Sequence, residues 1–201
     1  MVKKETIIIF MGFLLVFLAT IATSIVIPFF MIINRDLGID HVGIIEAFHV
    51  IMATLSLLVW GVCADRYDRR SILFLSTALW TGSALLLSIL PAHLVIYFFF
   101  RGVMGLGVGA ALPLIYSVLG DSVRMEERGK FSSGLSVAVI SGAGSGIILG
   151  TIFENFGWKN AFFFLSLAGI IIISPLLLYK VPKRGAQEPE LLSSDGLIDY
   201  N

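Results

Sequence analysis

Six long apolar stretches constrain the fold of this chain more than any other feature of the sequence. They occupy residues 7–33, 42–64, 71–90, 94–120, 131–153 and 161–179. A helix that crosses the roughly 30 Å hydrocarbon core of a bilayer needs about 20 mostly apolar residues, because unpaired backbone amides are too costly in lipid. A mean hydropathy of +0.95 also lies far above that of soluble domains. The sequence therefore predicts an all-α membrane protein with six transmembrane helices.

The rest of the chain consists of short connections and a polar tail. We expect one six-helix transmembrane domain over residues 1–181 and a disordered cytoplasmic linker over residues 182–201, because the tail is too short for a soluble domain. A cleaved signal peptide is the alternative for the N-terminus, since Lys3 and Lys4 precede the apolar run. That run stays uncharged to Ile33, about twice the length of a usual signal core, which favours a retained span.

The basic residues lie almost entirely on one side of a six-span arrangement. Cytoplasmic loops of membrane proteins collect Lys and Arg, so their distribution indicates the orientation. One side holds only Arg35 and Lys159. The other side holds eleven basic residues, namely Lys3, Lys4, Arg66, Arg69, Arg70, Arg124, Arg128, Lys130, Lys180, Lys183 and Arg184. We therefore expect a multi-pass protein of the cell (inner) membrane with both termini in the cytoplasm.

The two halves of the chain resemble each other. A shift of 89 residues aligns positions 61–74 with positions 150–163, and it also superimposes the limits of the three spans in each half. Because three spans are an odd number, the second unit must be inverted relative to the first. We expect two inverted three-helix repeats at about residues 6–91 and 94–180, an arrangement typical of transporters. A chance likeness between two loops is the alternative. The matched pairs are Gly61 with Gly150, Asp65 with Glu154, Tyr67 with Phe156, and Arg70 with Lys159.

A motif follows the second span. The stretch GVCADRYDRRSIL, residues 61–73, resembles the signature loop between the second and third helices of the major facilitator superfamily. The resemblance covers the six spans and implies the N-terminal half of a twelve-span transporter. Within that family, LWTGSALLLS and RGVMGLGVGAALP are similar to spinster-type and drug or organic-anion transporters, although Val108 stands where spinster-type members usually carry a glutamate. Further similarities are Arg101 with Gly105 and Gly107, Asp121 followed by Arg128 and Gly129, a glycine-rich fifth span, and FGWKNAF before the sixth.

The resemblance implies a gate at the cytoplasmic face, built on a relay of Asp65, Arg69 and Asp121. Asp65 and Arg69 are four residues apart, so a helical end places them on one face. Such a cluster would lock the cytoplasmic side while the outer side is open, and Asp68, which replaces a glycine usual in this turn, can compete for Arg69 or Arg70. The alternative is an ordinary positive-inside loop. The residues of the expected gate are Gly61, Asp65, Arg66, Arg69, Arg70, Asp121 and Arg128.

Three ionisable residues fall inside the predicted spans at a similar depth. They are Arg101 in the fourth span and Glu46 and His49 in the second. Ionisable groups inside a membrane are costly, so each indicates a function. We expect Arg101 to offer a positive charge at a cavity wall, and Glu46 and His49 to titrate and couple proton movement to transport. The alternative is that Arg101 braces neighbouring helices through backbone carbonyls and Glu46 reaches the outer interface.

Small and hydroxyl residues suggest where helices approach one another and where a solute binds. In the fifth span Gly142, Gly146 and Gly150 recur every four residues, and Gly105 and Gly109 do so in the fourth, which favours close helix packing. Thr20, Thr23 and Ser24 in the first span can line a cavity, although their hydroxyls can also bond their own backbone.

The sequence predicts a transporter rather than an enzyme. It contains no phosphate-binding loop, metal-ligand spacing or nucleophile with its base, so we expect no cofactor, no metal and no nucleic-acid partner. We expect secondary transport of a small organic solute by alternating access, with the lipid bilayer and either a second copy or a separate C-terminal half as partners. The fifth span lacks the proline of family antiporters, so antiport is not supported. A non-transporting sensor or scaffold and a truncated inactive fragment are the alternatives.

Overall fold

The computed structural model describes residues 4–123 and 125–174, and regular structure in this part of the chain is entirely helical. The predicted linker, residues 182–201, lies outside the described residues. The helices, with three short 3₁₀ turns between them, are α1 (Lys4–Ser24), η1 (Ile27–Phe29), α2 (Phe30–Leu37), α3 (Val42–Arg66), α4 (Arg69–Ile89), α5 (Leu94–Val108), α6 (Ala111–Ser122), η2 (Met125–Glu127), α7 (Arg128–Ile152), η3 (Glu154–Phe156) and α8 (Trp158–Ile173).

Five helical stretches are long and apolar enough to cross a membrane, so the all-α prediction is confirmed together with five of the six expected spans. The sixth expected span corresponds to α8, which has 16 residues in the described chain; the remainder of that span, from residue 175, lies outside it. The five stretches are Ile9–Leu37, Val42–Ala64, Arg69–Ile89, Leu94–Gly120 and Met125–Ile152.

Two of the spans are broken where proline removes a backbone donor. Between α1 and α2 the chain passes through η1, which contains Pro28. Between α5 and α6 the break lies at Gly109, where Ala110 N–H bonds the carbonyl of Gly107 at 3.3 Å in a tight turn. Pro113 has no N–H for the carbonyl of Gly109, four residues before it, and its ring crowds that carbonyl. Both breaks therefore follow from local chain chemistry.

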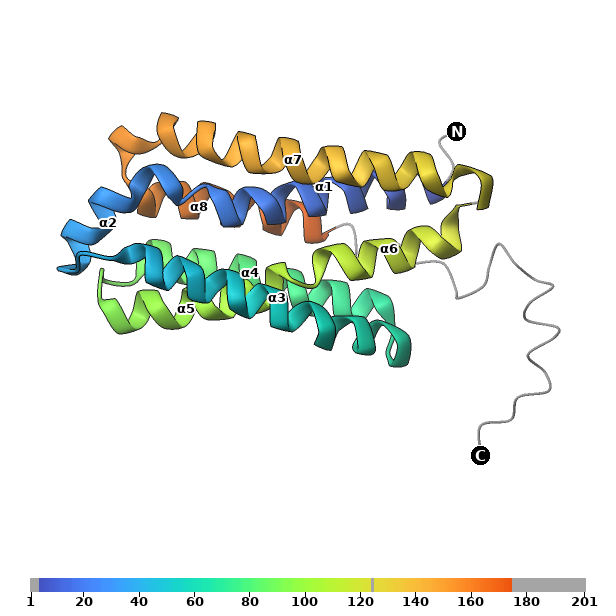
Figure 1. The fold of residues 1–201 in the computed structure, drawn as a ribbon, viewed down its shortest axis with the longest axis horizontal. Coiled ribbons are helices and arrows are strands. Elements are labelled where there is room, and N and C mark those ends of the chain that lie inside the picture. The colour runs from blue at the N-terminus through green and yellow to red at the C-terminus, as the bar shows by residue number, and fades with distance from the viewer. Residues whose placement is uncertain (1–3, 124, 175–201) are drawn as a thin grey trace.

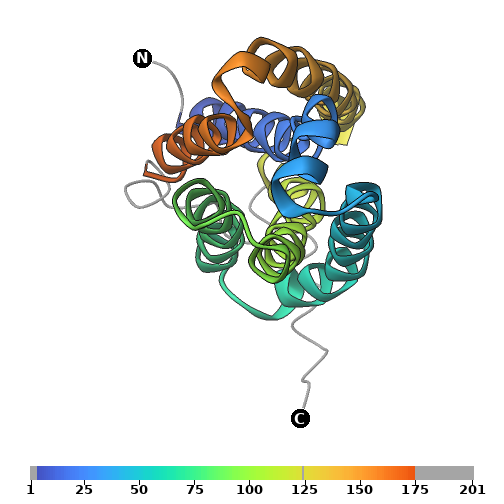
Figure 2. The same cartoon turned by 90° about the vertical axis from the view of Figure 1, so that its left-hand side faces the viewer.

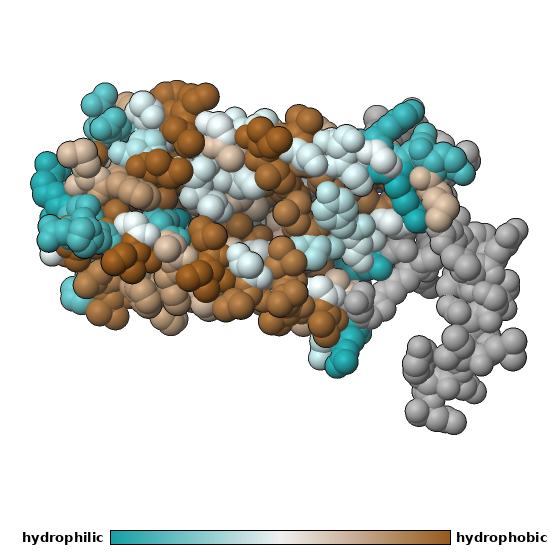
Figure 3. All heavy atoms as spheres, in the orientation of Figure 1, coloured by the Kyte–Doolittle hydropathy of each residue, from teal (hydrophilic) through white to brown (hydrophobic). Residues whose placement is uncertain are grey.

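The helices run along the long axis of an elongated bundle (Figure 1). In the end-on view of Figure 2, α1 lies between α7 and α8, and α5 lies between α3 and α4. The start of α1 and the α3–α4 and α6–α7 connections lie at one end of the bundle, and the α2–α3, α4–α5 and α7–α8 connections lie at the other. Figure 3 shows hydrophilic residues at both ends of the visible face and many apolar residues between them, as a membrane-spanning bundle requires.

Glycines allow two of these helix pairs to come unusually close. A Cβ added at Gly142 of α7 would lie 2.6 Å from the carbonyl oxygen of Phe17 in α1, and one added at Gly146 would lie 3.0 Å from that of Ile21. A Cβ added at Gly105 of α5 would meet the carbonyl of His49 in α3. Gly150 and Gly109 make equivalent close approaches, to Ile25 and to Ala53 respectively. The small residues therefore set the α1–α7 and α3–α5 distances.

Candidate functional site

An ion pair lies buried between α3 and α5. Arg101 on α5 is fully buried, and Glu46 on α3 is 8% exposed. The Arg101 guanidinium donates from Nε to Glu46 Oε1 at 3.0 Å, and Nη2 contacts Glu46 Oε2 directly. This two-point geometry suits a guanidinium and a carboxylate, and pairing offsets part of the large cost of burying each charge. The arrangement joins two residues that are 55 positions apart.

The guanidinium also contacts two further helices. Its Nη1 lies 3.4 Å from the carbonyl oxygen of Ala22 on α1, and its Cζ lies 5.7 Å from the ring centroid of Phe162 on α8. A cation over an aromatic face is attracted by the ring quadrupole. Arg101 therefore links α1, α3, α5 and α8, so it braces helices through a backbone carbonyl while it also pairs with Glu46.

His49 lies one turn after Glu46 on α3 and is fully buried. Its Nδ1 lies 2.9 Å from the backbone carbonyl oxygen of Arg101. Because a carbonyl only accepts hydrogen bonds, Nδ1 carries a hydrogen, and in the neutral ring Nε2 then carries the lone pair. That Nε2 has no hydrogen-bond partner among the described residues. The structure therefore brings together all three ionisable side chains that the sequence placed at one depth.

Two aromatic residues of this cluster were missed by the sequence reading. Tyr97, one turn before Arg101, donates its hydroxyl to Glu46 Oε1 at 2.8 Å. The Tyr97 ring meets the Trp158 ring edge-on at 5.6 Å, and Trp158 Nε1 donates to Asp36 Oδ2 at 2.9 Å. The sequence does place Tyr97 one helical turn from Arg101. This span contains many aromatic residues, however, so the spacing alone does not single out Tyr97.

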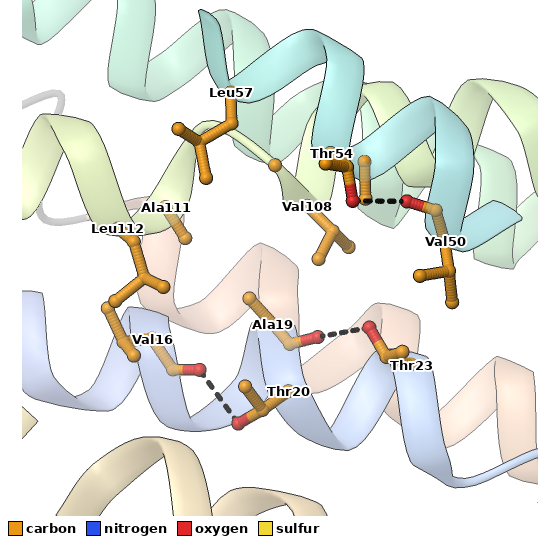
Figure 4. Close-up of a pocket in the computed structure, with 12 residues that line it drawn as sticks. Val16, Ala19, Thr20, Thr23, Val50, Thr54, Leu57, Val108, Ala111 and Leu112 are labelled. Carbon is orange, nitrogen blue, oxygen red and sulfur yellow. Dashed lines mark hydrogen bonds between the residues drawn. The ribbon is translucent and has the colours of Figure 1, made fainter. Parts of the chain in front are cut away.

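A separate cavity of about 180 Å³ opens between α1, α3 and the α5–α6 break (Figure 4). Thr20 and Thr23 line it as expected, whereas Ser24 is buried and donates to the carbonyl of Thr20 at 3.0 Å. Arg101 does not line it, contrary to the expectation of a charge at the cavity wall, because it is fully buried and its guanidinium contacts Glu46, the carbonyl of Ala22 and the ring of Phe162. The lining residues are Val16, Ala19, Thr20, Thr23, Val50, Ala53, Thr54, Leu57, Val108, Gly109, Ala111 and Leu112.

The expected gate at the α3–α4 connection is only partly described. The side chains of Asp65 and Asp121 lie outside the described ones, so their relay with Arg69 stays a prediction. Arg69 Nη1 donates to the carbonyl oxygen of Ser117 in α6 at 3.3 Å. Asp68 Oδ2 caps α4, since it accepts from Ser71 N at 3.1 Å and from Ser71 Oγ at 2.9 Å. The structure thus joins Arg69, at the start of α4, to α6, the helix that carries Asp121.

The other residues of the expected gate differ in their surroundings. Arg128, at the start of α7, donates from Nη2 to the carbonyl of Gly120 at 2.6 Å and from Nε to that of Val123 at 3.4 Å. Arg66 is exposed and Arg70 is half-buried. A Cβ added at Gly61 would meet no atom within 4 Å, so no close packing contact explains this glycine. Within the described residues no group of three or more His, Cys, Asp or Glu side chains could hold a metal ion.

The sequence profile described as Major Facilitator Superfamily matches residues 12–195 of the chain. The chain belongs to this superfamily. Protein spinster homolog 3 of Homo sapiens is 27% identical over 155 residues, which are 75% of this chain and 30% of that relative. The fold and the multi-pass membrane character are thereby established.

Solved structures show the same fold. A bacterial homologue of the human lysosomal transporter Spinster, in an inward-facing and occupied conformation, superimposes with a TM-score of 0.79 at 15% identity, over 94% of this chain and 47% of that one. A superfamily proton:xylose symporter, bound to 6-bromo-6-deoxy-D-glucose, superimposes with a TM-score of 0.80 at 17% identity, over 98% of this chain and 50% of that one. The chain therefore spans about half the length of these superfamily structures, and less of its curated relatives.

Proposed function

We propose that the chain is one six-span unit of a secondary transporter that moves a small organic solute by alternating access. The observation that carries this proposal is the cavity between α1, α3 and the α5–α6 break, in a superfamily fold that also holds a buried Arg101–Glu46 pair between α3 and α5. Solute sites of such transporters lie near the bilayer midplane, where helices are interrupted. One wall of the cavity is formed by such an interrupted span.

The contacts between helices support six spans in two inverted repeats. In the first repeat we count the α1–α2 span, α3 and α4, and in the second the α5–α6 span, α7 and α8. The first span of each repeat packs on the second span of the other, as α1 on α7 and α5 on α3, and the third spans, α4 and α8, pack on each other. A pseudo-twofold axis in the membrane plane requires this exchange. The basic side of the bundle is then cytoplasmic, with both termini.

Cysteine accessibility in sealed vesicles tests the inversion. The background is Cys63→Ser, because Cys63 is the single cysteine. Tyr67 and Phe156 are a matched pair of the two repeats and are 65% and 67% exposed. We expect Tyr67→Cys and Phe156→Cys to react with a membrane-impermeant maleimide from opposite sides, with Met125→Cys as a control on the Tyr67 side. Reaction of both members of the pair from one side would contradict inverted repeats.

We further propose that the cytoplasmic gate is the Asp65, Arg69 and Asp121 relay, and that the Arg101–Glu46–His49 cluster couples transport to protons. Arg69 already bonds α6 through Ser117, the span that carries Asp121. Neutralising Glu46 by a proton would weaken its attraction for Arg101, and both residues sit where α3 and α5 meet. Protonation of one carboxyl can in this way change the packing of two spans that border the cavity.

The superfamily structures are about twice as long as this chain, so we propose that a second six-span unit, which can be another copy of this chain or a C-terminal half, forms the second wall of the cavity. Among the five long spans, those of α3 and α7 are the least buried. Of the residues in their most apolar 18-residue segments, 28% and 22% are buried, against 50–56% in the other three spans. In Figure 2, α3 and α7 lie on the side opposite α8. Both helices expose apolar side chains, for example Leu58 on α3 and Ile140 on α7, which lipid or a second unit can cover, and we propose that the second unit packs on them.

Transport and assembly can be measured on the same preparation. Vesicles that contain the chain and a pH-sensitive dye are challenged with small solutes, beginning with xylose, and solute-dependent proton entry is expected to be lost in Glu46→Gln. Ile140 on α7 is 73% exposed, so Ile140→Cys in the Cys63→Ser background should form a symmetric crosslink, whereas Phe164→Cys on α8 should not. Failure of every solute to move, with only monomers after crosslinking, would contradict a self-assembling transporter.

A further inference from the structure

The side chains of the cavity wall offer hydrogen-bond acceptors but no free donor. Of its twelve lining residues, only the three threonines carry side-chain polar atoms. Thr20 Oγ1 donates to the carbonyls of Val16 and Phe17 at 3.0 and 2.9 Å, Thr23 Oγ1 to that of Ala19 at 3.3 Å, and Thr54 Oγ1 to that of Val50 at 2.9 Å. A hydroxyl has one hydrogen and two lone pairs, and each threonine already donates its hydrogen to a carbonyl of its own helix. What remains for a solute is acceptor capacity.

The backbone at the helix break provides a further acceptor. Gly109 lines the cavity, and Pro113, four residues later, has no N–H to donate to its carbonyl. That carbonyl therefore lacks its ordinary helical donor, which leaves another acceptor at a lining residue. The rest of the wall consists of Val, Ala and Leu side chains, which favour apolar surface.

The positive charge nearest in the sequence to this wall is already engaged. The guanidinium of Arg101 is fully buried and bonded at two points by Glu46, and the carboxylate also accepts from Tyr97. An anionic solute could pair with this guanidinium only by displacing Glu46, which would leave a buried carboxylate without its partner at a large cost. Among the described residues that line the cavity, none is charged.

From these three observations we infer that the cavity selects mostly apolar solutes that carry hydrogen-bond donors, such as hydrophobic alcohols, and disfavours their carboxylate and donor-free analogues. The inference rests on the proposed transport function and specifies the chemical class of its substrate. A volume of about 180 Å³ is smaller than the roughly 300–1,000 Å³ of complete ligand sites, so this unit would hold one end of the solute. The donor group of that end would meet Thr23 or Thr54, because Thr20 Oγ1 lies against Gly142 of α7.

Photoaffinity labelling of the full 201-residue chain in lipid nanodiscs tests this selection. Three probes share one alkyl diazirine chain and end in a hydroxyl, a methyl ether or a carboxylate, and labelled peptides are located by mass spectrometry. We expect the alcohol to label the cavity peptides more strongly than the ether by about 2- to 12-fold, the range for one neutral hydrogen bond. The carboxylate should label them least.

A cavity variant and a matched control distinguish labelling within the cavity from labelling through the surrounding lipid. Thr23→Val/Thr54→Val removes the acceptors with little change in shape, and it should reduce alcohol labelling to the level of the ether. Thr151→Val is the control, because Thr151 on α7 is exposed, bonds its own helix at Ile147 and lies outside the cavity. Circular dichroism and thermal unfolding of each variant verify that it is folded.

The outcomes distinguish this inference from the proposed function. Equal cavity labelling by alcohol and ether, with displacement by excess unlabelled ether, would overturn the donor preference and leave a solute site in place. Strongest labelling by the carboxylate would also overturn it. Labelling that no unlabelled probe displaces would show that lipid chains or a protein partner fill the cavity, and both the inference and the proposed transport site would then fail.

Discussion

The α3–α5 and α1–α7 contacts are built alike but differ in charge. In both, glycines of the second helix let it approach backbone carbonyls of the first, as Gly105 does at His49 and Gly142 at Phe17. The α3–α5 contact also contains the Arg101–Glu46 pair. The 89-residue shift places Leu135 opposite Glu46 and Gly12 opposite Arg101, so the α1–α7 contact has no such pair at the corresponding positions.

This difference separates packing from function within one architecture. Close helix approach needs only small residues and occurs in both contacts, so it is a property of the fold. A buried ion pair costs desolvation and adds stability only where its geometry is good, so its presence in one contact alone points to a function there. The proton-coupling proposal therefore concerns the α3–α5 contact. Substitutions at the ion pair should affect this contact, and added volume at Gly142 should affect the α1–α7 contact.

The largest effect is expected from removing one member of the ion pair. Glu46→Ala leaves the Arg101 charge buried without its partner, which should lower the free energy of unfolding by about 3–5 kcal/mol. The double variant Glu46→Leu/Arg101→Leu gives this contact the apolar character of its α1–α7 counterpart and should recover most of that loss. Thermal unfolding in detergent measures both. A double variant as unstable as Glu46→Ala would show that the pair does more than satisfy its own charges.

A smaller loss is expected when the pair remains and one supporting bond is removed. Tyr97→Phe deletes the hydroxyl that donates to Glu46 Oε1 at 2.8 Å and keeps the ring that packs on Trp158. A hydrogen bond to a charged group contributes about 1.5–3 kcal/mol. The loss of unfolding free energy caused by Tyr97→Phe is measured alone and in the Glu46→Leu/Arg101→Leu background. The difference between the two losses is the coupling free energy between the hydroxyl and the ion pair. An equal loss in both backgrounds would mean that the hydroxyl does not act through Glu46.

The α1–α7 contact, which lacks the ion pair, should lose stability when side-chain volume is added. Gly142→Ala places a Cβ against the backbone carbonyl of Phe17, and such overpacking costs about 1–3 kcal/mol. Gly144→Ala is the control on the same helix, since a Cβ at Gly144 would meet nothing within 4 Å. We expect the control to be neutral or slightly stabilising in the same unfolding measurement. Equal losses for the two variants would argue that α7 is sensitive to alanine for reasons other than its contact with α1.

The smallest effect concerns a neutral bond of the charged contact. Trp60 Nε1 on α3 donates to the carbonyl of Leu106 on α5 at 2.7 Å, and its counterpart in the α1–α7 contact is Leu149, which has no such donor. Trp60→Phe should cost about 0.5–1.5 kcal/mol, the contribution of one neutral hydrogen bond, together with some lost packing area. Hydrogen exchange at α5 provides the measurement. Unchanged protection of that helix would show that the indole bond does not hold α3 to α5.

The sequence by itself determined the features that depend on the bilayer and on local chemistry. Span lengths, the polar ends and the depth shared by Glu46, His49 and Arg101 follow from hydropathy and helical rise, because a bilayer imposes one thickness on every span. The break in the fourth span could also be anticipated, since Pro113 removes a specific backbone bond.

Only the tertiary structure decided which of these residues meet and which face the cavity. Arg101 was expected at a cavity wall but is buried against Ala22, Glu46 and Phe162, which come from three different helices. The role of Tyr97 and the cavity between α1, α3 and the α5–α6 break likewise depend on how distant spans pack. The physical reason is that hydropathy acts on each span separately, whereas a buried charge takes its partner from whichever neighbouring helix brings one within hydrogen-bond distance.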